Sequence, residues 1–180
     1  MMLCCIVLLV IPFLVSAQPS ESAFEELGFV FRSMADSSVD ATDFCATAPF
    51  RVDVATGFVL RSISARSSDG AIQDFGKQEI ATLEACFNLD GVPAGEFDFY
   101  SRAIFLKSGL AFTLDGTCRP LVISTPEPGV NQTNCTQLVV EAPLGYEGGL
   151  LVTNSLSPAS ASLGYNAGSI ASLRIFRERD

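Results

Sequence analysis

Apolar and polar residues alternate with a period of two along most of this chain. Clear stretches are Phe50–Val54, where Arg51 and Asp53 separate apolar residues, and Leu110–Leu114. Side chains two apart point to the same side of a β-strand, so this period predicts strands with one apolar and one polar face. Candidate strands cover residues 50–54, 58–65, 81–89, 97–106, 110–115, 120–124, 137–141, 150–154 and 169–176. This pattern is typical of an antiparallel barrel or sandwich, here of about eight strands.

The segment before residue 36 carries two conflicting patterns. Ser22 and Glu25 have the spacing of a capping box, which satisfies free backbone N–H groups at the start of a helix. Apolar residues then recur at helical spacing, at positions 24, 27, 31 and 34. Gly28 and the run Phe29–Phe31 favour a strand instead. The expected fold class is therefore all-β, or mainly β with one short N-terminal helix, followed by a polar loop over 36–43. Residues 80–87 fit a helix nearly as well as a strand.

Glycine marks the expected turns. Asp69-Gly70 and Asp115-Gly116 are turn signals because glycine adopts positive φ at little cost. Leu144–Gly149 and Leu163–Gly168 share the pattern Leu-Gly-Tyr-x-x-Gly, so Tyr146 and Tyr165 occupy equivalent places in it. Two similar turns at one end of a β-structure explain this echo, and a tyrosine-lined mouth of a pocket is the functional alternative.

The beginning of the chain predicts export. Met1–Ala17 has an uncharged start, an apolar run that ends at Val15, and small residues at the −3 and −1 positions before Gln18. These are the features of a cleaved secretory signal, and an apolar run of about thirteen residues is too short to cross a bilayer as a helix. We therefore expect a signal peptide over 1–17, a single disulfide-stabilised β domain over 18–180, and a secreted, extracellular protein.

Four cysteines remain in the expected mature chain: Cys45, Cys86, Cys118 and Cys135. An even number of cysteines in an exported chain predicts two disulfides. Three pairings are possible, and the sequence alone does not choose among them. We expect Cys118–Cys135, which would close a short excursion between two candidate strands, together with Cys45–Cys86. A metal site is the poorer alternative, because no two cysteines have CxxC spacing and the chain has no histidine.

Two overlapping sequons follow a turn-rich stretch at 125–129. Asn131-Gln132-Thr133 and Asn134-Cys135-Thr136 both match the acceptor pattern N-x-[ST]. We expect a glycan on at least one of Asn131 and Asn134. Simultaneous use is disfavoured, because neighbouring glycans crowd each other.

The chain is acidic, with 20 Asp and Glu residues against 11 Lys and Arg, and a formal net charge of −9. Nucleic acids and anionic lipid surfaces are bound through clustered basic residues, and the sequence has no basic run of five or more. We therefore expect no nucleic-acid partner, no membrane span and a soluble product. No feature of the sequence indicates an oligomeric state.

The sequence carries no recognisable catalytic motif. The absence of histidine removes the usual neutral-pH base and every Ser-His-Asp or Cys-His nucleophile arrangement. Asp36, Asp40 and Asp43 lie in a polar loop, but they do not follow the order of an EF-hand Ca²⁺ site. No cofactor or metal ion is expected.

One row of polar residues remains a candidate for chemistry. Glu96, Asp98, Tyr100 and Arg102 have the same parity on a candidate strand, so their side chains share one face. In one interpretation they line a polar lumen. In the other they form the wet face of a half-buried sheet, with Phe97 and its neighbours in the core. The direction of these side chains distinguishes the two interpretations.

These observations favour a secreted soluble glycoprotein that acts as a non-catalytic binding domain. Its partner would be a protein, a cell surface or a small apolar ligand, and the candidate binding residues are Tyr146, Tyr165, Asp98, Tyr100 and Arg102. The alternatives are a histidine-free β-barrel enzyme of the cyclase or isomerase type, with the carboxylates, Tyr100 and Arg102 in its lumen, or a structural extracellular component. The fourteen phenylalanines supply aromatic area to a core without distinguishing a filled barrel interior from an empty one.

Overall fold

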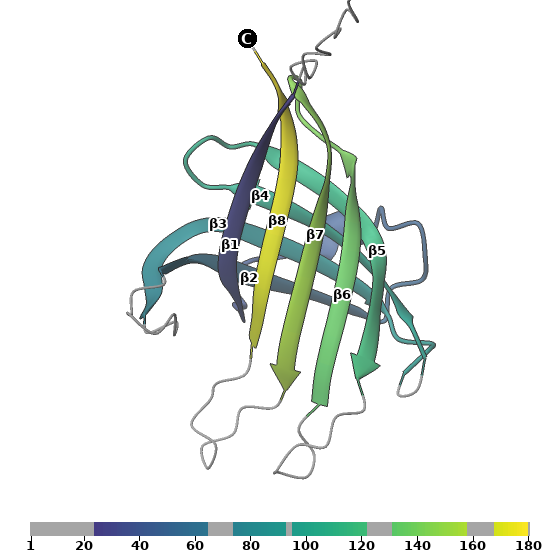
Figure 1. The fold of residues 1–180 in the computed structure, drawn as a ribbon. Helices are drawn as coiled ribbons and strands as arrows, with labels where there is room; N and C mark the ends of the chain where they lie inside the picture. The colour runs from purple at the N-terminus through teal and green to yellow at the C-terminus, as the bar shows by residue number, and fades with distance from the viewer. Residues whose placement is uncertain (1–23, 65–73, 93–94, 122–130, 158–167, 180) are drawn as a thin grey trace, which may run out of the picture.

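Figure 1 shows the computed structural model, which describes residues 24–64, 74–92, 95–121, 131–157 and 168–179. Most of these residues lie in long antiparallel strands, and there is one short helix, so the expected all-β class is confirmed. The elements are β1 Phe24–Ala35, α1 Thr42–Cys45, β2 Val54–Ser64, β3 Asp74–Asn88, β4 Phe97–Phe105, β5 Ala111–Leu121, β6 Asn131–Glu141, β7 Tyr146–Ser157 and β8 Gly168–Glu178. The expected signal peptide and the Asp69-Gly70 turn lie outside the described residues.

The strands close into one barrel. Each strand pairs with its neighbour in sequence, and β8 returns to pair with β1 from Phe24↔Glu178 to Ser33↔Ser169. Of the two expected architectures, the chain therefore adopts the barrel and not the sandwich. Closure creates an interior toward which alternate side chains of every strand point.

The helix expected near the N-terminus is wrong. Residues 24–35 form β1, in which Phe31 and Ser33 are buried in the barrel while Val30 is exposed on its outer face. Residues 24–33 pair with β8 and residues 31–35 with β2, and that tertiary pairing outweighs the helical spacing. Residues 80–87, which also fitted a helix, form part of β3.

The described helix α1 begins in the last two residues of the stretch expected to be a loop, 36–43, and extends beyond it to Cys45. The Asp40 carboxylate accepts a hydrogen bond from the Thr42 backbone N–H at 2.9 Å, which satisfies a free donor at the start of the helix. Phe44 and Cys45 are buried against the outer face of the barrel. No helix in the described part of the chain is long and apolar enough to cross a bilayer.

Both expected disulfides are confirmed. Cys45–Cys86 fastens α1 to the outer side of β3, and Cys118–Cys135 joins directly paired residues of β5 and β6 inside the barrel. The Cys45–Cys86 bridge therefore secures the segment between β1 and β2 on the outside of the sheet, and the Cys118–Cys135 bridge lies in the barrel interior.

The turn expected at Asp115-Gly116 is wrong, because both residues lie within β5. Gly116 is needed there for close approach and not for a bend. A Cβ atom at this position would lie 2.1 Å from the Thr136 carbonyl oxygen, so a larger residue would push β6 away.

Candidate functional site

Aromatic side chains fill one end of the barrel. Phe29, Phe105, Phe112 and Tyr146 form a continuous chain of ring contacts, with centroid distances of 4.9, 5.9 and 5.3 Å between successive rings. These rings come from four different strands, so together they pack across the lumen. These rings occupy the lumen at this end, and a smaller cavity of about 210 Å³ lies beside Phe29 and Phe105.

A cavity of about 300 Å³ lies inside the opposite end of the barrel, where β1, β3, β5 and β7 end and β2, β4, β6 and β8 begin. No charged side chain is among the described residues that line it. Its volume is at the lower limit of the range typical of small-molecule sites. Because an ion would lose its hydration here without gaining a partner, the walls suit an uncharged occupant.

The strands β2, β3 and β4 supply an apolar wall to this cavity. Phe87 stacks on Phe99 with a centroid distance of 4.6 Å, and its ring lies 6.1 Å from that of Phe97. The wall consists of Val54, Leu83, Phe87, Leu89, Phe97 and Phe99. Phe31, Leu151 and Ala171 extend the apolar lining deeper into the barrel on the other side.

The strands β6, β7, β8 and β1 supply a row of hydroxyl groups, which we call the hydroxyl arc. Thr133 pairs with Ser155, Ser155 with Ser169, and Ser169 with Ser33, so the four residues are successive cross-strand neighbours. All four line the cavity, and the Thr153 hydroxyl lies one inward-facing position deeper on β7. The arc therefore follows half of the barrel circumference.

The hydroxyl arc retains unused hydrogen-bonding capacity. Ser155 and Ser169 bond to each other through their hydroxyl oxygens. Within the described part of the chain, the hydroxyls of Ser33, Thr133 and Thr153 make no hydrogen bond, although Ser33 is 4% exposed and Thr153 7% exposed. Their oxygens are open to the cavity, since among the described residues Arg61 Nε is the buried side-chain polar atom that lacks a partner, so water or a ligand can bind them.

A fully buried polar pair lies next to the cavity. Gln137 follows Cys135 as the next inward-facing residue of β6, and Ser101 follows Phe99 on β4. The Ser101 hydroxyl donates to Gln137 Oε1 at 2.9 Å, and Gln137 Nε2 donates to the Phe99 carbonyl at 2.8 Å. These bonds satisfy the amide within the protein, so it serves the architecture of the barrel.

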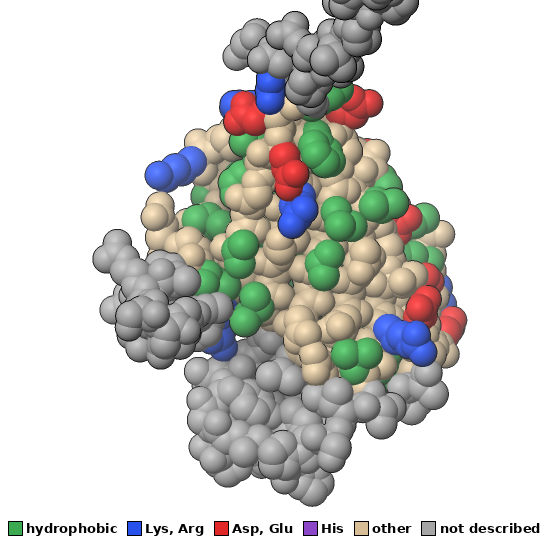
Figure 2. All heavy atoms as spheres, in the orientation of Figure 1, with side chains coloured by type: hydrophobic (Ala, Val, Ile, Leu, Met, Phe, Trp, Pro, Cys, Tyr) green, Lys and Arg blue, Asp and Glu red, His purple; other side chains and the backbone are tan. Residues whose placement is uncertain are grey.

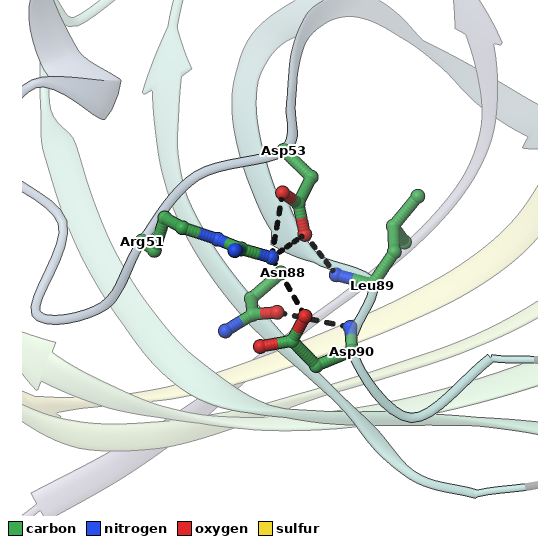
Figure 3. A network of polar contacts seen from close by, with 5 residues as sticks. All are labelled: Arg51, Asp53, Asn88, Leu89 and Asp90. Carbon is green, nitrogen blue, oxygen red and sulfur yellow. Dashed lines mark hydrogen bonds and ion pairs between the residues drawn. The ribbon is translucent and has the colours of Figure 1, made fainter.

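An ion-pair network lies beside the apolar part of the cavity rim (Figure 3). Arg51 pairs with Asp53 at 3.0 Å and with Asp90 at 2.6 Å, and the Leu89 backbone N–H donates to Asp53 at 2.8 Å. The bond from Leu89 and the nearby Arg51 charge lower the pKa of Asp53. The network fastens the chain before β2 to the end of β3, next to the rim residues Val54 and Leu89.

The candidate residues of β4 lie outside the barrel. Phe97 and Phe99 line the cavity, so Asp98, Tyr100 and Arg102 alternate onto the outer face. Glu96 is exposed just before the strand. These side chains therefore lie on the wet face of a half-buried sheet and do not line a polar lumen.

Tyr100 and Arg102 hold α1 against the barrel. The Tyr100 ring stacks on the Phe44 ring at a centroid distance of 5.0 Å, and the Arg102 guanidinium lies 4.7 Å from the centre of the Phe44 ring. Arg102 Nε also donates to Glu84 Oε2 at 2.5 Å, a contact that raises the pKa of Arg102. Burial, followed by the nearby acidic charges, raises the pKa of Tyr100. These contacts give Tyr100 and Arg102 a structural role, which is to hold α1 on the barrel.

The two candidate tyrosines are not brought together in the described residues. Tyr146 packs in the filled end of the lumen, where Arg177 pairs with Glu25 at 2.9 Å beside it. Tyr165 lies outside the described residues. Its nearest described neighbours along the chain, Ser157 and Gly168, are at the cavity end of the barrel.

The two sequons fall on β6. Asn134 and Thr136 are exposed on the outer face, on either side of the buried Cys135. Asn131 begins the strand, and its side chain lies outside what the structure describes. Asn134 is therefore open to modification from the solvent side.

Apolar side chains also lie on the outer face formed by β1, β8, β7 and β6 (Figure 2). Val30, Leu138 and Val152 are between 42% and 60% exposed on this face. One ion pair crosses it, between Arg174 and Glu26 at 3.5 Å. This half of the barrel thus carries apolar residues on both sides of the sheet.

Comparison of the chain with protein-family models, curated proteins and solved structures finds no match. Evidence for function therefore comes from the cavity itself.

The sequence analysis missed the hydroxyl arc. Thr133 and Ser155 lie just outside the strands expected at 137–141 and 150–154, because serine, threonine and asparagine interrupt the apolar alternation there. The signal that could have found it is alternation, since Thr133, Ser155 and Ser33 occupy inward-facing positions of their strands. Its recognition requires the registers of four strands, which hydrophobic periodicity does not determine.

Proposed function

We propose that this protein binds a small, uncharged, largely apolar molecule in the cavity of its barrel. The observation that carries the proposal is a cavity of about 300 Å³ lined by aromatic, aliphatic and hydroxyl side chains, with no charged group among its described residues. Small-molecule sites combine such apolar walls with a few oriented polar groups.

Two further observations support binding more than catalysis. Asp98, Tyr100 and Arg102, the residues that a barrel enzyme would use inside its lumen, lie on the outer face, where Tyr100 and Arg102 hold α1. The aromatic chain from Phe29 to Tyr146 fills the other end of the interior. Aromatic rings therefore occupy the lumen beyond the cavity, which suits retention of a ligand.

The proposed setting is extracellular. Two intramolecular disulfides are consistent with an oxidising compartment, and the leader-like segment at 1–17 supports the same location. The exposed Asn134 and Thr136 side chains support a glycan on the outer face of β6, away from the cavity.

Filling the cavity tests the proposal. Ala171 is 1% exposed and lines the pocket, so Ala171→Leu places extra methyl groups in the space that a ligand would occupy. We expect the uncharged fluorescent probe N-phenyl-1-naphthylamine to bind the unmodified protein. Its affinity for the variant should be lower by about tenfold or more, which corresponds to about 1.4 kcal/mol.

Ser172→Leu is the matched control, because Ser172 is the next residue of β8 and alternates onto the outer face. Fluorescence titration, with circular dichroism to verify folding, should show unchanged probe binding in this variant. Saturable binding that Ala171→Leu leaves intact, or no binding by the unmodified protein, would contradict the proposal.

A further inference from the structure

We infer that the ligand is an amphipathic ring compound, with an apolar ring system and hydroxyl or carbonyl oxygen at one edge that bonds to the hydroxyl arc. This inference deepens the proposed function and depends on it. It follows from the unequal chemistry of the two halves of the cavity wall and from hydroxyl groups that lack protein partners.

The two halves face each other across the lumen. In the closed strand order, β6, β7 and β8 lie opposite β2, β3 and β4. The hydroxyl arc of Thr133, Ser155, Ser169 and Ser33 therefore faces the apolar wall that contains Phe87. A ligand spanning the cavity touches hydroxyl groups on one side and aromatic rings on the other.

The hydroxyl side is prepared for a polar group. Ser33 and Thr153 are both more than nine-tenths buried, line the cavity, and make no hydrogen bond through their hydroxyls to any described residue. Hydroxyls both donate and accept, so they can bind a ligand hydroxyl or a carbonyl oxygen. A pure hydrocarbon would leave these groups unsatisfied, which disfavours it as the ligand.

The apolar side is prepared for a ring. Phe87 and Phe99 stack with an interplanar angle of 19°, and Phe97 is tilted against Phe87 at 59°. Aromatic rings favour offset-stacked or edge-to-face contact with a further ring. The wall therefore offers more to a flat unsaturated ligand than to a flexible chain.

A matched set of three probes tests the inference: naphthalene, 2-naphthol and 2-naphthoate. They share one ring system and differ in having no polar group, one hydroxyl and one carboxylate. At neutral pH we expect 2-naphthol to bind about three- to tenfold more tightly than naphthalene, the effect of one added hydrogen bond. We expect 2-naphthoate to bind most weakly, because the described walls offer its charge no partner. Competition with N-phenyl-1-naphthylamine gives the three affinities.

Two variants locate the hydrogen bond. Thr153→Val keeps the shape of the side chain and removes the hydroxyl, and Ser33→Ala does the same on β1. Either variant, or both combined, should reduce the preference for 2-naphthol over naphthalene toward parity while leaving naphthalene binding unchanged. Thr117→Val, an equivalent substitution on the exposed outer face of β5, should preserve the preference. The Ser33 variant keeps the test valid if the Thr153 variant fails to fold.

The outcomes separate this inference from the proposed function. Equal affinity for naphthalene and 2-naphthol in the unmodified protein overturns the inference and leaves the binding function standing. A preference that survives in the combined Ser33→Ala, Thr153→Val protein also overturns it. If none of the three probes displaces bound N-phenyl-1-naphthylamine, the inference that the ligand is an amphipathic ring compound is wrong. If that reporter itself fails to bind, the proposed function is wrong as well.

Discussion

Gln137 is the residue around which the buried polar contacts of the barrel are organised. Its amide accepts from Ser101 and donates to the backbone carbonyls of Phe99 and Leu114, at 2.8 and 3.3 Å. The side chain reaches β4 from β6 across β5, which approaches β6 closely at Gly116. One side chain therefore links three strands beside the cavity.

Replacement of this amide should be costly. Gln137→Leu keeps the approximate size of the side chain but leaves the Ser101 hydroxyl without its acceptor. We expect a loss of about 1–3 kcal/mol in the free energy of unfolding, measured by urea denaturation. Ser101→Ala combined with Gln137→Leu should cost less than the sum of the two single changes, because the partners are then removed together. Strictly additive losses would show that the pair is not coupled.

At the scale of elements, α1 is attached from outside and does not contribute to the cavity. Phe44 is 6% exposed between Tyr100 and Arg102, and the neighbouring Cys45 is bonded to Cys86. The helix contacts the outer side of β2, β3 and β4. Stability and ligand binding should therefore respond differently to changes in this helix.

Phe44→Ala should reveal this separation. We expect it to lower the free energy of unfolding by about 3 kcal/mol, since it removes a buried ring. The affinity for N-phenyl-1-naphthylamine should stay unchanged under native conditions. Phe176→Ala, at a half-exposed phenylalanine on the outer face of β8, is the control and should cost less than half as much. If Phe44→Ala weakened probe binding in folded protein, α1 would have to influence the cavity.

The elements also show how far sequence reasoning extends. The alternation around Phe97 and Phe112 was sufficient to predict strands, because that pattern is local. The helical spacing from Phe24 to Met34 was misleading, since β1 is fixed by pairing with strands at residues 58–62 and 169–178. The cavity wall was out of reach for the same reason, because Ser33 and Thr133 become neighbours of one surface only through registers around the barrel. The disulfides were predictable because few pairings of four cysteines exist.

At the scale of the whole molecule, several acidic groups are stabilised in the connection between β1 and β2. The pKa values of Asp36 and Asp40 are lowered by hydrogen bonds from Ser38 and Thr42, and that of Asp53 chiefly by the bond from Leu89. A group whose pKa is lower in the folded state stabilises the fold above its unfolded pKa of about 3.9 for Asp. That contribution is lost as the pH falls through the folded pKa.

Asp53→Asn tests this dependence. The variant should be less stable than the unmodified protein at neutral pH, and the difference should disappear as the pH falls from about 4 toward about 2, because protonated Asp53 has then lost its charge too. Urea unfolding across this range measures it. Asp43→Asn is the control, since the Asp43 carboxylate makes no hydrogen bond to another described residue. A deficit in Asp53→Asn that is equally large in acid would exclude the proposed titration.

The seam between the first and last strands has a consequence for biosynthesis. Phe24 is opposite Glu178 across that seam, so a growing polypeptide cannot complete its ring of strands until β8, the last of the eight, has been translated. Up to that moment the nascent sheet has two open borders, each able to recruit a stray strand from another molecule. Chaperones that shield such sheet edges during synthesis would therefore matter more for this chain than for a protein whose strands pair only with their neighbours in sequence.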